Sequence, residues 1–88
     1  MIRFEDVAAA RHRISPHIRT TPMIAMDESN AFPAAGRVWL KLESLQMTGS
    51  FKVRGATNKL LTTPAAEMES GIVTASGGNH GLAVAHVA

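Results

Sequence analysis

A lysine at the expected start of a helix is the residue of this chain whose position most directly suggests chemistry. Lys52 follows an apolar, β-branched segment, residues 38–42, that predicts a strand, and it precedes a helical pattern that ends near Leu61. We predict a helix from Ser50, with Lys52 in its first turn. The positive end of the helix dipole disfavours an ammonium group there by roughly 0.3–1 kcal/mol. An unprotonated or covalently modified amine relieves this repulsion and is nucleophilic, whereas the alternative is a solvated surface lysine.

A second polar turn, Thr74–Gly81 (TASGGNHG), has similar surroundings. It follows residues 72–74, which predict a strand, and precedes the apolar run 82–87, which predicts a helix. A glycine-rich turn before a helix can offer backbone amides to an anion. The turn matches neither the dinucleotide fingerprint nor the P-loop. Its alternative interpretation is a plain Gly-Gly turn in which Asn79 caps the helix.

The two motifs together resemble those of the threonine/serine dehydratases, which belong to the fold-type II, tryptophan-synthase-like family of pyridoxal-phosphate (PLP) enzymes. The resemblance rests on residues 41–56 (KLESLQMTGSFKVRGA) and on residues 76–81 (SGGNHG), and it extends upstream to residues 19–22 (RTTP). It implies an α/β fold with parallel sheets flanked by helices. Residues 1–65 would belong to the N-terminal part of the large PLP-binding domain, and residues 66–88 would begin the small domain.

The resemblance also implies roles for individual residues. Lys52 would hold PLP as a Schiff base and act as general base at the substrate α-carbon. Phe51 would pack against the pyridine ring, although the residues alone leave a plain core phenylalanine equally open. Asn79 would donate to the phenolic oxygen of the cofactor. The residues that would grip the α-carboxylate of the substrate are Ser76, Gly77, Asn79 and His80. Arg54 is interpreted as structural, pairing with a carboxylate or a backbone carbonyl.

The reaction that the resemblance implies is the conversion of L-threonine or L-serine to a 2-oxo acid and ammonia, by α-proton abstraction and β-elimination. Gly77 favours this lyase over a racemase. Similar enzymes that racemise serine carry a serine at this position, and glycine provides no proton donor on the face opposite the lysine. A serine or hydroxyaspartate racemase and a β-replacement enzyme remain alternatives. A non-catalytic fragment or a small anion-binding module is the alternative from another class.

The elements that must position these residues follow from the remaining patterns. Residues 4–14 predict a helix that ends at Pro16. Residues 20–26 predict an extended segment, because a residue that precedes proline is biased toward β. Residues 27–36 predict a polar connector, with a short helix starting at Ser29.

A second short helix is predicted with Thr63 as N-cap, Pro64 at its first position and Gly71 at its end. We expect the domain boundary between residues 62 and 71. The order strand, helix, strand, helix predicts an α/β protein with parallel pairing.

Length and composition limit the size of the fold and the classes of function that we expect. The chain has 88 residues, of which 45% are hydrophobic and 18% charged, so we expect at most one small soluble domain. It has no cysteine, which excludes disulfides and thiolate zinc sites. The net charge of +2 contains no basic run, so nucleic acid is not an expected partner. His12 and His17 lie five residues apart without a suitably spaced carboxylate, so we expect no metal site.

No apolar run reaches the roughly 18 residues of a membrane span, and the first residues lack a signal-peptide core. We therefore expect a cytoplasmic protein with an amino-acid substrate, no membrane partner and a homo-oligomeric state. The apolar helix at residues 82–88 ends without a stop signal, which predicts that the sequence is the N-terminal piece of a longer enzyme. The family's phosphate-binding loop lies outside it, so this piece alone is expected to be inactive.

Overall fold

The structure, a computed structural model, describes residues 1–26 and 36–88. Its first element is helix α1, Phe4–Ile14, as the sequence predicts. The backbone N–H of Arg3 donates to the Asp6 carboxylate at 2.8 Å, which satisfies one amide at the helix start. Arg11 and Arg13 lie in the last turn, where positive charge complements the helix dipole. A single 3₁₀ turn, Ser15–His17, follows at Pro16.

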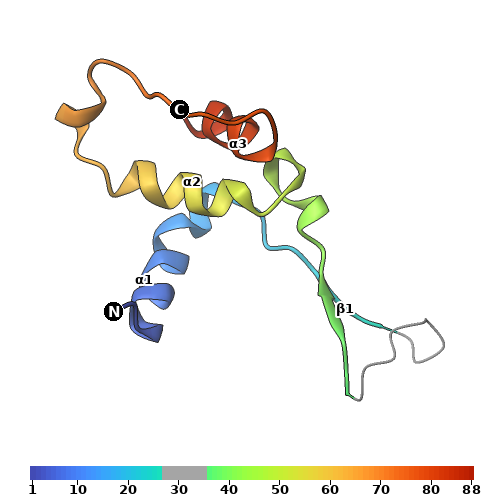
Figure 1. The fold of residues 1–88 in the computed structure, drawn as a ribbon. Coiled ribbons are helices and arrows are strands. Elements are labelled where there is room, and N and C mark those ends of the chain that lie inside the picture. Colours follow the sequence, from blue (N-terminus) through green and yellow to red (C-terminus); the bar gives the residue numbers. More distant parts are fainter. Residues whose placement is uncertain (27–35) are drawn as a thin grey trace.

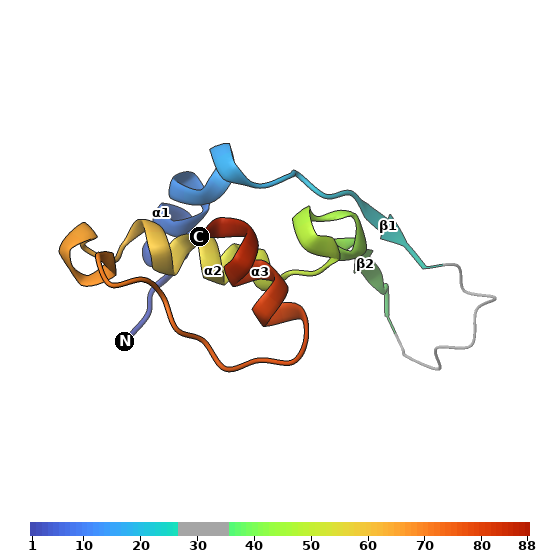
Figure 2. The same ribbon diagram turned by 90° about the horizontal axis from the view of Figure 1, so that it is seen from above.

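Two short strands form a ribbon that projects from the helices (Figures 1 and 2). Strand β1 is Met23–Ala25 and strand β2 is Trp39–Lys41, each within a segment for which the sequence predicts extended structure. They pair antiparallel, with Met23 opposite Lys41. The parallel pairing that we expected concerns residues 38–42 and 72–74, and this ribbon is a separate pairing of β2 with β1. The short helix that we predicted from Ser29 lies outside the described residues.

Helix α2, Lys52–Leu61, begins after two consecutive 3₁₀ turns, Glu43–Leu45 and Met47–Gly49. The helix starts two residues later than predicted. Ser50 is still extended, with φ −152° and ψ 169°, and its hydroxyl accepts the Lys52 N–H at 3.4 Å. Ser50 thus lies before the helix instead of opening it, and Phe51 is the N-cap, without a side-chain cap hydrogen bond.

Helix α3, Asn79–Val87, packs along α2. The shared core is small and consists of Val53, Ala56 and Ala83, each at most 5% exposed. The two helices run in the same direction, so their N-termini lie at one end of the helix pair, beside the turn Met47–Gly49 (Figures 1 and 2). This arrangement brings the two sequence motifs to the same end.

The connection between α2 and α3 differs most from the sequence-based expectations. Residues 72–74, which the sequence predicts as a strand, belong to no helix or strand in the described chain, and no other strand lies beside them. The short helix is a 3₁₀ turn, Ala65–Met68, that Pro64 precedes rather than starts. Thr63 does not cap it, since its hydroxyl donates back to the Lys59 carbonyl at 2.6 Å. Gly71 closes the turn with φ +95°, as expected for a glycine in the left-handed region.

Within the described residues, no helix has both the length and the apolar character that crossing a membrane requires.

Candidate active site

Lys52 is the first residue of α2, and its side chain is exposed. Its Nζ lies 5.3 Å from the centre of the Phe51 ring, which is itself 59% exposed. Phe51 is therefore not a core residue of the described chain. No carboxylate among the described residues forms an ion pair with Lys52. The result is an accessible amine beside an accessible aromatic face, at a helix start whose free amides favour anions.

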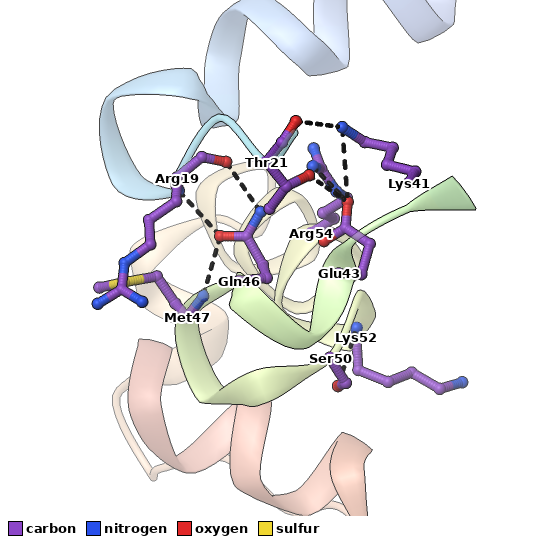
Figure 3. Close-up of polar contacts among 9 residues, drawn as sticks. All are labelled: Arg19, Thr21, Lys41, Glu43, Gln46, Met47, Ser50, Lys52 and Arg54. Carbon is purple, nitrogen blue, oxygen red and sulfur yellow. Dashed lines mark hydrogen bonds and ion pairs between the residues drawn. The ribbon is translucent and has the colours of Figure 1, made fainter. Parts of the chain in front are cut away.

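A buried glutamine supports the turn before this lysine. Gln46 is 2% exposed, and its Oε1 accepts the backbone N–H groups of Arg19 and Met47 at 2.8 and 3.0 Å. Its Nε2 donates to the Arg19 carbonyl at 2.9 Å, as Figure 3 shows. One side chain thus ties the segment before β1 to the turn that leads into α2. An apolar residue here would leave three backbone groups without these partners.

The chain then reverses through two residues with positive φ. Thr48 has φ 63° and Gly49 has φ 76°. Glycine adopts this conformation freely, but for a β-branched residue it costs of order 1–3 kcal/mol. Such strain persists only where the surroundings impose it, and the contacts of Gln46 on the preceding residue are one such constraint. The reversal delivers Ser50 and Lys52 to the start of α2.

The carboxylate of Glu43 contacts Arg54 in the first turn of α2. Oε1 of Glu43, whose side chain is 16% exposed, accepts the Arg54 Nε at 2.8 Å and forms an ion pair with the same guanidinium group. It also accepts the Thr21 hydroxyl at 3.2 Å, and Lys41 Nζ lies 3.9 Å away. Burial raises the pKa of Glu43, but the hydrogen bond and the positive charge of Arg54 outweigh it, so this pKa lies below its ordinary value. The predicted pairing of Arg54 with a carboxylate is confirmed.

The second motif forms an open turn ahead of α3. Gly78 is the N-cap of the helix, and its N–H donates to the Ser76 hydroxyl at 3.2 Å. Asn79 is the first helical residue and does not cap the helix, so the plain capping interpretation is wrong. Ser76, Gly77 and His80 are all exposed. The amides that begin α3 therefore face open space at the same end of the molecule as Lys52.

A close approach between this turn and its helix depends on Gly81. A Cβ at this position would lie 3.1 Å from the Ser76 carbonyl oxygen, closer than ordinary contact. By contrast, a Cβ on Gly77 or Gly78 would meet no atom within 4 Å. The glycine in the helix thus sets how tightly the turn folds over it.

One cavity in the described chain lies away from Lys52. It has a volume of about 330 Å³ and lies between α2, the 65–68 turn, residues 71–74 and α3. His80 and Thr74 line it, but Lys52 and Phe51 do not. The structure thus gathers Lys52, Phe51 and the residues 76–79 at one end without enclosing them, and the imidazole of His80 borders a different space. In the described residues, no group of three histidine or acidic side chains could hold a metal ion.

Three residues of this region were not singled out by sequence reasoning: Glu43, Gln46 and Gly81. Glu43 and Gln46 stand within the motif that carries the family resemblance, and a polar residue at 2% exposure cannot be recognised without a structure. We expected Gly81 in the turn before a helix over residues 82–87, whereas it lies inside α3, where glycine costs about 1 kcal/mol relative to alanine. Its close approach to Ser76 depends on how the turn folds, which the sequence pattern does not record.

Comparison with known proteins gives one family and several relatives. The family model described as pyridoxal-phosphate dependent enzyme matches residues 14–88. The chain is 42% identical over 85 residues to the catabolic L-threonine dehydratase TdcB of Staphylococcus aureus, covering 97% of the chain and 25% of that protein. It is 41% identical to the β-hydroxyaspartate dehydratase of Paracoccus denitrificans, over 97% of the chain and 27% of that protein.

A solved structure, that of maize serine racemase, superposes with a TM-score of 0.78 and 33% identity. The match covers 92% of this chain and 25% of the racemase. The chain therefore spans about a quarter of the length of the relatives that it matches. The fold class and the resemblance stated from the sequence motifs are confirmed by these matches.

Proposed function

We propose, from the premise that this chain belongs to the family of pyridoxal-phosphate dependent enzymes, that the whole protein is an ammonia-lyase acting on L-threonine or L-serine. The observation that carries the proposal is the shared end of α2 and α3, at which an exposed lysine and an open, glycine-rich helix start lie together. The names of two relatives, a threonine dehydratase and a β-hydroxyaspartate dehydratase, support a lyase.

The residues at this end fit the cofactor of the family. PLP needs a primary amine to hold its aldehyde carbon, and Lys52 provides one that no described carboxylate neutralises. Its planar ring needs an apolar face, and Phe51 offers one beside that amine. Asn79 carries a side-chain amide that can donate to the phenolic oxygen of the cofactor. When bound, PLP supplies a sink for the electron pair that the substrate α-carbon releases.

The turn before α3 suits the substrate. An amino acid presents a carboxylate, and the first amides of a helix attract anions through both their unpaired N–H groups and the helix dipole. In our proposal Ser76, Gly77, Asn79 and His80 hold this carboxylate. Lys52 then takes the proton from the α-carbon, the β-hydroxyl leaves as water, and hydrolysis of the resulting enamine by another water molecule gives a 2-oxo acid and ammonia.

The proposal has further parts that concern the whole protein. Residues 1–65 would belong to its large domain and residues 66–88 would open its small domain, with the boundary in the connection that contains the left-handed Gly71. We also propose that the whole protein is a homo-oligomer. A cytoplasmic location completes the proposal, and cell fractionation would check it.

The decisive experiment measures 2-oxo acid and ammonia formed from L-threonine and L-serine by the whole protein. Lys52→Ala should abolish turnover, because it removes both the cofactor attachment and the base. Lys59→Ala, near the other end of the same helix, is the matched control and should retain activity. Turnover that survives Lys52→Ala would contradict the proposal.

A racemase is the second candidate, and the similarity to maize serine racemase is the observation that favours it. Racemisation requires a proton donor on the face of the α-carbon opposite Lys52, and Gly77 has no side chain to supply one. The whole protein should therefore eliminate water with little inversion of recovered substrate. Chiral analysis combined with deuterium uptake at the α-carbon distinguishes the two reactions. Racemisation of serine as fast as its deamination would favour the racemase.

A further inference from the structure

We propose that Glu43 is a positioning residue for Lys52, acting through Arg54. This inference rests on the proposed function, because it explains how the chain aims the amine that the proposal assigns to catalysis. Glu43 lies on the first 3₁₀ turn after β2, and Arg54 lies in the first turn of α2. Their contact joins the ribbon to the start of the helix (Figure 3).

The contact restrains the helix in more than one direction. Two nitrogens of the Arg54 guanidinium group meet the same carboxylate oxygen, one by a 2.8 Å hydrogen bond from Nε and the other by the ion pair. The Glu43 and Arg54 side chains are only 16% and 30% exposed, so water weakens the attraction less than on an open surface. Thr21 holds the same oxygen from the segment before β1. Oε1 of Glu43 is thus held by Thr21 as well as by Arg54.

Helix geometry explains why the Glu43–Arg54 contact does not involve the Lys52 amine. Successive residues of an α-helix are turned by about 100°, so side chains two positions apart point to nearly opposite sides. Arg54 is two residues after Lys52. Figure 3 shows the Lys52 side chain pointing away from Glu43 and Arg54. The carboxylate can therefore fix the rotation of the first turn without neutralising the amine that this turn presents.

The other hydrogen bonds near the helix start are weaker restraints than this ion pair. The Ser50 hydroxyl accepts the Lys52 N–H at 3.4 Å, near the limit of a hydrogen bond. Gln46 holds the preceding turn but does not touch α2 in any described hydrogen bond. Between them lie two left-handed residues, Thr48 and Gly49. Arg54 is thus the side chain through which charge ties the first turn of α2 to the rest of the chain.

The test compares the reactivity of Lys52 with that of an internal reference lysine. The cofactor-free whole protein is exposed briefly to PLP, whose aldehyde condenses with an amine and loses water. Borohydride then reduces the C=N bond to a stable secondary amine, and peptide mass spectrometry gives the ratio of label on Lys52 to label on Lys59. The variants are Glu43→Gln, Arg54→Gln and the double variant. Glu69→Gln removes an exposed carboxylate as the control.

We expect either single substitution to lower the Lys52-to-Lys59 label ratio about tenfold and kcat by about ten- to a hundredfold, because small misplacement of a reacting group is that costly. KM should change by less than about twofold, since in the proposal the substrate carboxylate is held elsewhere. If Glu43 acts through Arg54, the double variant should lose no more than either single one. Glu69→Gln should leave the ratio unchanged.

Three results would overturn the inference: an unchanged label ratio in both single variants, strictly additive losses, or a rise in KM at constant kcat. If circular dichroism shows that Glu43→Gln does not fold, the label ratio is measured on Arg54→Lys instead. It keeps the positive charge but lacks the second nitrogen, and we expect it to lower the label ratio. Failure of the proposed function looks different, because wild-type Lys52 would then take no more label than Lys59.

Discussion

Replacing Gly81 with alanine should destabilise the turn that precedes α3, although alanine favours helices. Alanine in place of glycine within a helix contributes roughly 1 kcal/mol of stability. At Gly81, however, the added Cβ would lie 3.1 Å from the Ser76 carbonyl oxygen, and ordinary contacts begin at 3.4 Å. The neighbour is backbone, so the turn itself must move by a few tenths of an ångström.

Gly55 provides the matched control, since it also lies inside a helix and its Cβ would meet no atom within 4 Å. Gly55→Ala should therefore raise the free energy of unfolding by roughly 0.5–1 kcal/mol. Overpacking typically costs about 1–3 kcal/mol, so Gly81→Ala should range from neutral to about 2 kcal/mol less stable than wild type. The two variants should differ by about 1–3 kcal/mol.

Thermal unfolding of the whole protein followed by circular dichroism gives the sign of this difference, because a destabilised variant has a lower Tm. Hydrogen exchange over residues 76–79 locates it. Exchange there should accelerate in Gly81→Ala and stay unchanged in Gly55→Ala. A Gly81→Ala protein as stable as Gly55→Ala, with unchanged exchange in this turn, would refute the idea that the close approach of Ser76 requires glycine.

Three further predictions concern the same end of the molecule. Borohydride reduction of the whole protein should fix a pyridoxyl group on Lys52, and a peptide map with the label on Lys59 would contradict the assignment. Gly77→Ser should add only a small racemase activity, measured by chiral analysis of recovered serine; the site has room for the side chain, but proton transfer also requires hydrogen-bond geometry. The pKa of Glu43 lies below its ordinary value of 4.5, so its ionised form stabilises the fold above that pH, and this contribution disappears as pH falls through the lowered pKa. The stability difference between wild type and Glu43→Gln, from urea unfolding at several pH values, should therefore shrink in acid; a difference that stays constant would show that the charge contributes nothing.

Local sequence was sufficient for several features of this chain. The helix over residues 4–14, the placement of Lys52 in the first turn of a helix and the left-handed Gly71 depend on neighbours a few positions away. Caps, dipoles and backbone preferences act over such distances, so the pattern of residues carries them. The family followed from two motifs for the same reason, because each motif is a continuous stretch.

Tertiary structure decided what depends on partners distant in sequence. Residues 72–74, predicted as a strand, have no strand beside them in the described chain, and β2 pairs instead with β1, a segment predicted only to be extended. Pairing depends on which segments meet, and propensity does not record that. The same holds for the Glu43–Arg54 contact and for the shared end of α2 and α3. Packing of Val53 and Ala56 against Ala83 sets how the two helices lie together, and so places the start of α2 and the start of α3 at the same end of the helix pair (Figures 1 and 2).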